Sequence, residues 1–124
     1  MEPAASGAPA PSGGTAGGNV ITLDETGSLQ ITDPNGQQVK TITVTKGQTY
    51  HFKITNSAGF THNFYVGKVS DLEAANAANL TGTGDFTSGT KEFDYTFNDT
   101  QDMGFGCIVP GHYQAGMSGT FTVQ

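Results

Sequence analysis

The segment that decides both the fold and the chemistry of this chain lies near its C-terminus and reads GCIVPGHYQAGM, residues 106–117. It places a cysteine, a histidine and a methionine at intervals of five residues, at Cys107, His112 and Met117. Thiolate, imidazole and thioether are soft or borderline ligands, and together they suit a copper ion that changes oxidation state. Gly111 and Gly116 within the segment allow sharp backbone reversals, so one loop between strands can bring the three side chains together.

A mononuclear copper site of this type needs a second imidazole, in a His₂Cys set with a weak axial methionine. We expect His62 to supply it, because it is placed at the start of an expected strand and is followed by Asn63. His51 alternates onto the polar face of its own strand, so we interpret it as a solvent-facing structural residue. Met103 is expected to pack in the core or a loop.

Outward from this segment the chain has the pattern of an all-β, antiparallel two-sheet sandwich. Short apolar and polar alternations are separated by Gly, Asn, Asp and Pro, which predicts about seven or eight strands. The expected strand segments are residues 20–23, 29–31, 42–44, 50–55, 62–66, 93–97 and 121–123. Residues 71–79, DLEAANAAN, are Ala-rich with an acid near their start and predict one short helical segment.

The two candidate ligand segments together resemble a known family. Thr61-His62-Asn63-Phe64 and the sequence CIVPGHYQAGMSGTFTV, residues 107–123, are similar to the cupredoxins, the type 1 blue copper proteins that include plastocyanin and azurin. The resemblance covers about residues 19–124 and implies a Greek-key sandwich that binds one copper ion, Cu⁺ or Cu²⁺, per chain. It implies equatorial ligation by His62, Cys107 and His112, with Met117 as the axial ligand.

The resemblance also implies roles for residues around the metal. Asn63 would tie the two ligand segments together, and its neighbourhood would donate a hydrogen bond to the cysteine sulfur. The spacing from Cys107 to His112 is azurin-like, whereas that from His112 to Met117 is plastocyanin-like. A further carbonyl ligand from Thr61 stays open. The edge of the His112 ring would be the electron-transfer surface, within a mostly apolar rim of Ile108, Val109, Pro110, Tyr113, Ala115 and Met117.

Length and charge limit the organisation of the chain and the partners it can have. Its 124 residues fit one domain, and its formal charge of −6, with only five basic residues, argues against a nucleic-acid partner. Residues 1–18 are nearly all Ala, Gly, Pro, Ser and Thr, so we expect a flexible tether before a domain at residues 19–124. Such a tether fits the mature start of an exported protein or the stalk of a removed lipid anchor, and so a periplasmic or otherwise extracytoplasmic location.

The main functional hypothesis is single-electron transfer by a monomer between extracytoplasmic redox proteins. A c-type cytochrome or a membrane-bound respiratory or photosynthetic complex would be the partner. We do not expect an enzyme, because three histidines and one cysteine are too few for a multicopper oxidase or a dinuclear copper centre. The alternative is a copper-binding module for storage, delivery or resistance.

Two other readings of the same residues fit the sequence less well. A Cys–His nucleophile would need an orienting residue such as Asn63, and it leaves Met117 and the second histidine without a role. A zinc site could use Cys and two His, although thioether is a poor zinc ligand. Asp99 and Asp102 resemble a carboxylate pair but are interpreted as a solvated turn.

Overall fold

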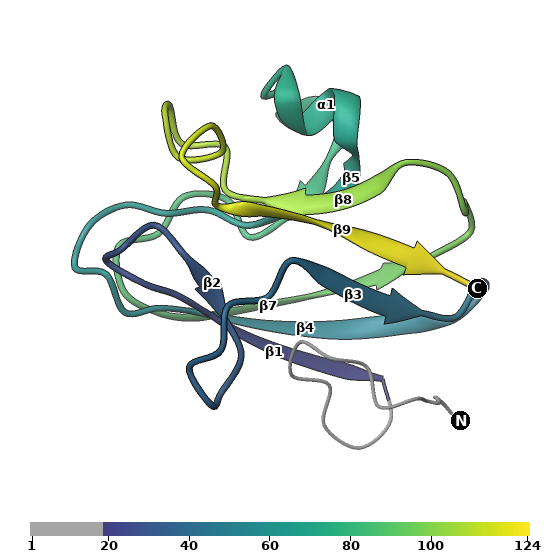
Figure 1. The fold of residues 1–124 in the computed structure, drawn as a ribbon, viewed down its shortest axis with the longest axis horizontal. Helices are drawn as coiled ribbons and strands as arrows, with labels where there is room; N and C mark the ends of the chain where they lie inside the picture. The colour runs from purple at the N-terminus through teal and green to yellow at the C-terminus, as the bar shows by residue number, and fades with distance from the viewer. Residues whose placement is uncertain (1–18) are drawn as a thin grey trace.

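The computed structural model describes residues 19–124, which form a sandwich of two β-sheets (Figure 1). The expected tether, residues 1–18, lies outside the described residues. One sheet has the order β2-β1-β4-β7, with β1 at Val20–Glu25, β2 at Ile31–Thr32, β4 at Thr49–Asn56 and β7 at Gly89–Thr96. The other has the order β3-β9-β8-β5-β6, with β3 at Thr41–Val44, β9 at Ser118–Val123, β8 at Met103–Gly106, β5 at Tyr65–Lys68 and β6 at Thr81–Gly82.

The predicted all-β sandwich is confirmed, and most strand pairs are antiparallel, but each sheet also contains one parallel pair. β1 pairs with β4 in parallel, and β3 pairs with β9 in parallel, so both sheets are mixed. Side chains alternate in the same way in parallel and antiparallel strands, so the hydrophobic pattern does not carry strand direction. The described chain has nine strands, whereas the sequence predicted about seven or eight. The two-residue β6 and the uniformly buried β8 were not predicted, because neither shows an alternation of apolar and polar residues.

The helical segment is present near the expected position but is split in two. α1 spans Val69–Glu73, and a 3₁₀ helix follows at Ala77–Asn79. Between them Ala75 has a positive φ of 53°, which interrupts the helical backbone. α1 lies on the outer side of β5 and β8 (Figure 1), where the buried Leu72 anchors it.

Phenylalanine rings from both sheets fill the space between them. Phe52 stacks on Phe93 with ring centroids 5.0 Å apart, and Phe97 lies 4.7 Å from Phe121 of the opposite sheet. Met103 is buried in the same core. Aromatic packing of this density makes a rigid base for whatever the connecting loops carry.

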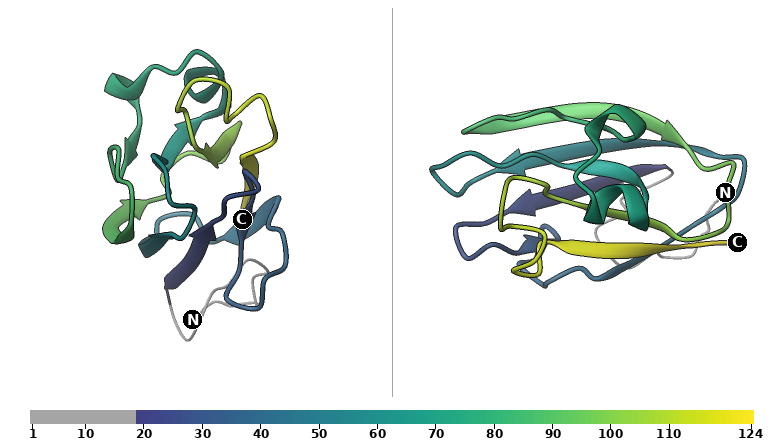
Figure 2. Two further views of the ribbon diagram at one scale, coloured as in Figure 1. Left: turned by 90° about the vertical axis from the view of Figure 1, so that its left-hand side faces the viewer. Right: turned by 90° about the horizontal axis from the view of Figure 1, so that it is seen from above.

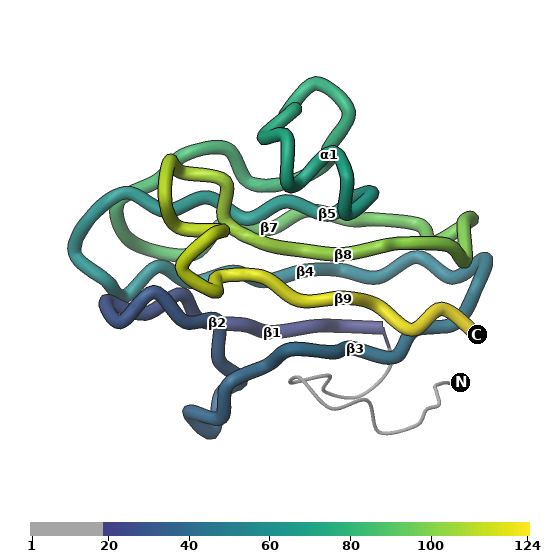
Figure 3. Tube along the Cα trace, turned by 45° about the horizontal axis from the view of Figure 1, so that its top comes forward, coloured from purple at the N-terminus to yellow at the C-terminus, as the bar shows by residue number. Residues whose placement is uncertain are grey.

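Two loops at one end of the sandwich carry the candidate ligands. Residues 107–117 connect β8 to β9 at the end away from the C-terminus (Figure 2), and the tube in Figure 3 shows this loop doubling back on itself. His62 does not begin a strand as expected: it forms an isolated bridge with Phe86, and β5 begins three residues later at Tyr65. Among residues 19–124, no helix has the length and apolar character needed to cross a bilayer.

Candidate metal centre

The loop of residues 107–117 is wound into consecutive hydrogen-bonded turns. The amide of Cys107 donates to the carbonyl of Met117 at 3.0 Å, which closes the loop at its base, and the amide of Met117 donates to the carbonyl of His112 at 3.1 Å. Gly111 and Gly116 have φ values of 88° and 110°, the left-handed backbone that glycine adopts without strain. These reversals place Cys107 and His112 on the same side of the loop.

Close packing at the base of the loop depends on a further glycine. A Cβ atom on Gly106 would lie 2.7 Å from the carbonyl oxygen of Met117 and 2.8 Å from the Tyr113 ring. Any larger residue would therefore push the loop away from β8, so Gly106 sets how closely Cys107 approaches the remaining donors.

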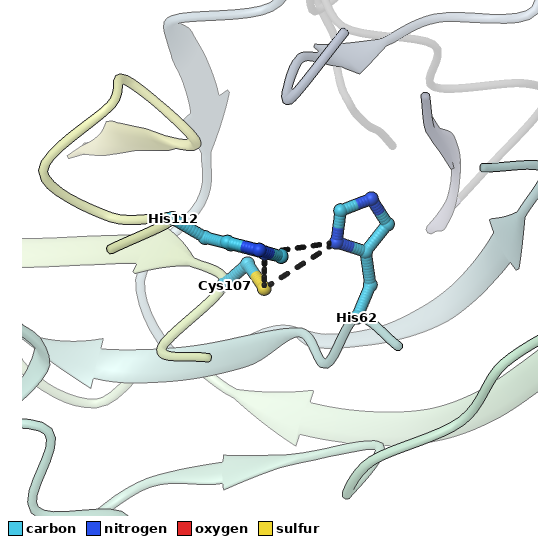
Figure 4. Close-up of side chains that lie close together, drawn as sticks. All are labelled: His62, Cys107 and His112. Atoms are coloured by element: carbon cyan, nitrogen blue, oxygen red, sulfur yellow. Dashed lines mark hydrogen bonds between the residues drawn. The ribbon is translucent and has the colours of Figure 1, made fainter. Parts of the chain in front are cut away.

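Three donor atoms from distant parts of the sequence meet at one point (Figure 4). The Nδ1 atoms of His62 and His112 are 3.2 Å apart, and Cys107 Sγ lies 3.7 Å from the first and 3.5 Å from the second. His62 and Cys107 are fully buried, whereas His112 is partly exposed. Met117 is also fully buried, and its backbone carbonyl accepts the hydrogen bond from the Cys107 amide at the base of the loop.

The donor set fits a copper ion. A first-row metal about 2.0–2.1 Å from nitrogen and about 2.3 Å from sulfur spans donor separations of roughly 3.3–3.8 Å, close to those observed. Two imidazoles and a thiolate in a trigonal arrangement are the ligands of a type 1 copper centre. His62, Cys107 and His112 would hold the ion, and Met117 remains the predicted axial ligand.

His62 is held in the ring orientation that metal binding needs. Its Nε2 lies 3.0 Å from the carbonyl oxygen of Thr26, and because a carbonyl only accepts, Nε2 carries the hydrogen. The Nδ1 atom then presents its lone pair toward Cys107 and His112. A backbone carbonyl that fixes the tautomer of a histidine ligand is a common outer contact of metal sites.

Asn63 links the two ligand-bearing segments in the way the resemblance implies. Its backbone amide donates to Cys107 Sγ at 3.4 Å, and its Oδ1 accepts from the amide of Ile108 at 2.7 Å. Its Nδ2 donates to Asp85 at 2.9 Å. Hydrogen bonds to a ligating sulfur reduce its electron donation to the metal, so Asn63 both holds and tunes Cys107.

Burial sets the protonation of the metal-free donors. It raises the pKa of the Cys107 thiol to about 11, although hydrogen bonds from the amides of Asn63 and Val109 oppose this. Burial, and then the neighbouring His62, lowers the pKa of His112, which favours the neutral imidazole that a metal requires. A metal entering at neutral pH therefore displaces the proton of the thiol.

The residues predicted to form the electron-transfer surface differ in their exposure. Pro110 is exposed, whereas Val109 and Tyr113 are half-buried. Sequence reasoning missed Phe60, which is 42% exposed and lies edge-on to both ligand rings, 5.0 Å from His62 and 6.1 Å from His112. Its position in a turn before His62 gave no periodic signal.

Two residues at the end of β1 were also missed. The carbonyl of Thr26 orients His62, and no side-chain pattern reveals a carbonyl contact. Glu25 is fully buried, and neither of its carboxyl oxygens has a hydrogen-bond partner in the described part of the chain. A signal for it existed, since Glu25 continues the inward alternation of Ile21 and Leu23 along β1.

The two-sheet fold and the His–Cys–His site define a mononuclear copper protein. The family model of copper binding proteins of the plastocyanin/azurin family matches residues 33–124. The chain therefore belongs to this family, which confirms the cupredoxin resemblance and the assignment of copper as its cofactor.

Relatives and solved structures support the same conclusion. The copper-resistant cuproprotein CopI of Rubrivivax gelatinosus is 25% identical over 118 residues, which is 86% of this chain and 71% of that protein. The CopI of Pseudomonas aeruginosa is 52% identical over 33 residues, only 27% of this chain and 18% of its own length.

Dithionite-reduced auracyanin of Roseiflexus castenholzii superposes with a TM-score of 0.69 at 23% identity, covering 88% of this chain and 99% of its own. Rusticyanin superposes with a TM-score of 0.61 at 21% identity, over 88% and 82% of the two chains. At these identities the solved structures show the shared fold.

Proposed function

We propose that this protein carries single electrons between extracytoplasmic redox proteins through one copper ion. The observation that supports the proposal is the difference in exposure between the donors: His62 and Cys107 are fully buried, and only His112 reaches the surface. A site open at a single imidazole edge exchanges electrons without admitting a substrate. Bound copper supplies the one-electron couple, and the chain supplies the fixed donors around it.

Rigidity of the donors favours electron transfer over reaction. The carbonyl of Thr26 holds His62, the amide of Asn63 holds Cys107, and the turns of the loop hold His112. Little has to move when the charge of the site changes, so the reorganisation that accompanies electron transfer is small. The apolar rim at Val109 and Pro110 excludes water when a partner docks, as expected of small, transient redox interfaces.

The formal charge of −6 suits a monomeric carrier that docks to a partner with a basic face, such as a c-type cytochrome. A membrane-bound respiratory or photosynthetic complex would use the same surface. This proposal places the protein in the periplasm or another extracytoplasmic compartment.

The test is stopped-flow reduction of the cupric protein by a reduced c-type cytochrome, in wild type and two variants. Pro110→Glu adds a negative charge at the rim, and Asn98→Glu adds the same charge in the exposed loop that follows β7. Pro110→Glu should change the rate constant at least several-fold with an unchanged visible spectrum, and Asn98→Glu should leave it near the wild-type value. Equal effects of both variants would contradict exchange at the His112 edge.

The second candidate function is copper resistance through storage or delivery, which is supported by the similarity to the copper-resistant cuproprotein CopI. A delivery protein must release its metal, whereas a carrier must retain it through many redox cycles. Competition with a cuprous chelator separates the two. Retention of copper through repeated reduction supports the carrier, and rapid loss of cuprous ion supports delivery.

A further inference from the structure

Glu25 is a buried acid that the proposed electron transfer does not use. It is the last residue of β1, its side chain is fully buried, and neither carboxyl oxygen has a hydrogen-bond partner among residues 19–124. An ionised carboxylate in such a place is strongly disfavoured, because neither water nor a donor compensates its charge. Burial, followed by the nearby charge of Asp24, raises the pKa of Glu25 to about 9.

Glu25 lies on the buried side of the copper site. The next residue, Thr26, receives the Nε2 hydrogen of His62. The charge of Glu25 also acts on Cys107, whose pKa it helps to raise. Its oxygens are nevertheless outside the group of donor atoms that converge on the metal, so Glu25 is a neighbour of the site and not one of its ligands.

No cation neutralises Glu25 within the described part of the chain. Lys40 donates instead to the carbonyls of Gly116 and Ser118. On the strands that pair with β1, the residues opposite Glu25 are Ile31 and Asn56, which do not titrate. The charged and titratable groups that act on Glu25 or feel its charge are therefore Asp24 on its own strand and Cys107 in the donor cluster with His62 and His112. Asp85 acts on Cys107 as well.

The metal site faced by Glu25 changes its charge during the proposed function. One thiolate and two neutral imidazoles carry a charge of −1, so the loaded site is +1 with cupric ion and neutral with cuprous ion. In a poorly solvated interior, one unit of charge at short range alters the proton affinity of a neighbouring acid substantially. Glu25 must therefore bind its proton more tightly when the site is reduced.

We propose that Glu25 is a proton-binding site coupled to the redox state of the copper, and that it takes up one proton when the protein accepts an electron. The inference rests on the proposed electron transfer and deepens it. The electron comes from the donor protein and the proton from solvent; the only bond formed is the O–H bond of the Glu25 carboxyl. On oxidation the electron leaves to the acceptor, that O–H bond breaks and the proton returns to solvent.

Coupling of this kind makes the reduction potential depend on pH within a defined window. The window lies between the pKa of Glu25 in the oxidised protein and its pKa in the reduced protein. Within it, the ratio of cupric to cuprous protein at a fixed applied potential should change tenfold per pH unit, so the reduction potential should change by about 59 mV per pH unit. Outside the window the potential should be flat. The reduced state, with its neutral site, sets the upper limit of the window.

The test is potentiometry from pH 5 to 10 with small-molecule mediators, on wild type, Glu25→Gln and Asp24→Asn. Glu25→Gln keeps the shape and removes the titration, and Asp24→Asn is the matched control because Asp24 is a neighbouring, partly exposed carboxyl. Wild type should show the sloping window, Asp24→Asn should show it displaced to lower pH because the Asp24 charge is removed, and Glu25→Gln should be flat with an unchanged visible spectrum. A flat wild-type curve, a slope that persists in Glu25→Gln, or a spectrum of Glu25→Gln that reveals a lost copper ligand would overturn the proposal.

A second measurement uses the metal-free wild-type protein, so it does not depend on whether Glu25→Gln folds or on bound copper. Infrared spectra of the metal-free wild type at pH 7 should contain the C=O stretch of a protonated buried carboxyl, and its absence would also overturn the proposal. Mediators replace protein partners in the potentiometry, so the proton coupling is tested separately from partner exchange. Coupling without exchange would leave this proposal standing and remove the electron-carrier function.

Discussion

The two candidate histidine ligands differ in almost everything except the atom they present. His62 is fully buried, lies before a core strand and donates to the carbonyl of Thr26. His112 is partly exposed, lies in a loop of turns and has no hydrogen bond from Nε2 among residues 19–124. The difference shows how one site combines a fixed side, built into the sandwich, with an accessible side through which electrons can pass.

The fixed side should dominate the pH dependence of the metal-free protein, because it contains Glu25. Its pKa is about 9 when folded and about 4.5 when unfolded, so the folded state holds more protons between these values. The contribution of Glu25 to stability is therefore greatest below about pH 4.5, falls as pH rises, and levels above about pH 9, with a slope of about 1.4 kcal/mol per pH unit at its steepest.

Urea unfolding of metal-free wild type and Glu25→Gln across this range measures that slope. The variant should gain stability relative to wild type as pH rises, whereas Asp24→Asn should keep a slope that ends at lower pH, because the charge that helps to raise the pKa of Glu25 is removed. Parallel curves for wild type and Glu25→Gln would mean that Glu25 is hydrated or paired in solution.

Truncation of the two histidines tests the contrast directly. His62→Ala should destabilise the metal-free fold by about 2–4 kcal/mol, since it opens a buried cavity and removes one of the two hydrogen bonds that the Thr26 carbonyl accepts. His112→Ala should cost less than about 1 kcal/mol, because its ring is partly exposed and is not anchored. Equal losses in urea unfolding would contradict the division into a fixed and an accessible side.

Asn63 connects the fixed side, which contains His62, to the loop that contains His112. Replacing its side chain should therefore loosen this loop relative to His62. Asn63→Ala leaves the Ile108 amide without its acceptor and Asp85 without a donor, at a cost of about 1–3 kcal/mol. The backbone bond to Cys107 remains, so the copper-loaded variant should keep its thiolate absorption but with shifted bands. An unchanged unfolding midpoint and spectrum would show that the side chain does not hold the site.

The exposed side should respond to Phe60 with little change in stability. Phe60→Ala removes a 42% exposed ring that contacts both imidazoles, so unfolding should change by about 1 kcal/mol or less. The rate of electron exchange with a reduced cytochrome should change several-fold, whereas Phe60→Tyr should behave as wild type. Wild-type kinetics for Phe60→Ala would place docking elsewhere.

The smallest effect is expected far from the site, at His51. Its two ring nitrogens lie 2.6 Å from Glu92 and from Asp94, and these hydrogen bonds raise its pKa above the ordinary value. The stability that these hydrogen bonds contribute is present below the pKa of His51 in the unfolded chain. It is lost as pH rises through the pKa of His51 in the folded protein. Because the group is exposed, His51→Gln should remove a weak, salt-sensitive pH dependence, measurable by thermal unfolding at low and high salt.

Much of the site was predictable because its chemistry is concentrated in one segment. Cys107, His112 and Met117 share a loop, and their thiolate, imidazole and thioether groups favour copper as the bound metal. His62 could be chosen because His51 belongs to a solvent-facing position. The convergence of three of these donors needed the structure, since it depends on the turns of residues 107–117 and on the bridge of His62 with Phe86.

Features that depend on strand direction or on backbone atoms were not predictable. The parallel pairings of β1 with β4 and of β3 with β9 leave no trace in alternation. The contact of His62 with the carbonyl of Thr26 was not predictable either, because a backbone carbonyl is present at every residue and gives no sequence signal. Glu25 differs, because its inward position follows from the alternation along β1, but the strand expected from the sequence ended at residue 23.

The central claim, a copper site that uses the Cys107 thiolate for one-electron chemistry, is tested most directly by visible absorption. Addition of one equivalent of cupric ion to the metal-free protein should produce an intense thiolate-to-copper charge-transfer band. The band should bleach with ascorbate, return on reoxidation and be missing in Cys107→Ser. Folded protein that binds cupric ion without this band, or that keeps the band in Cys107→Ser, would contradict the account.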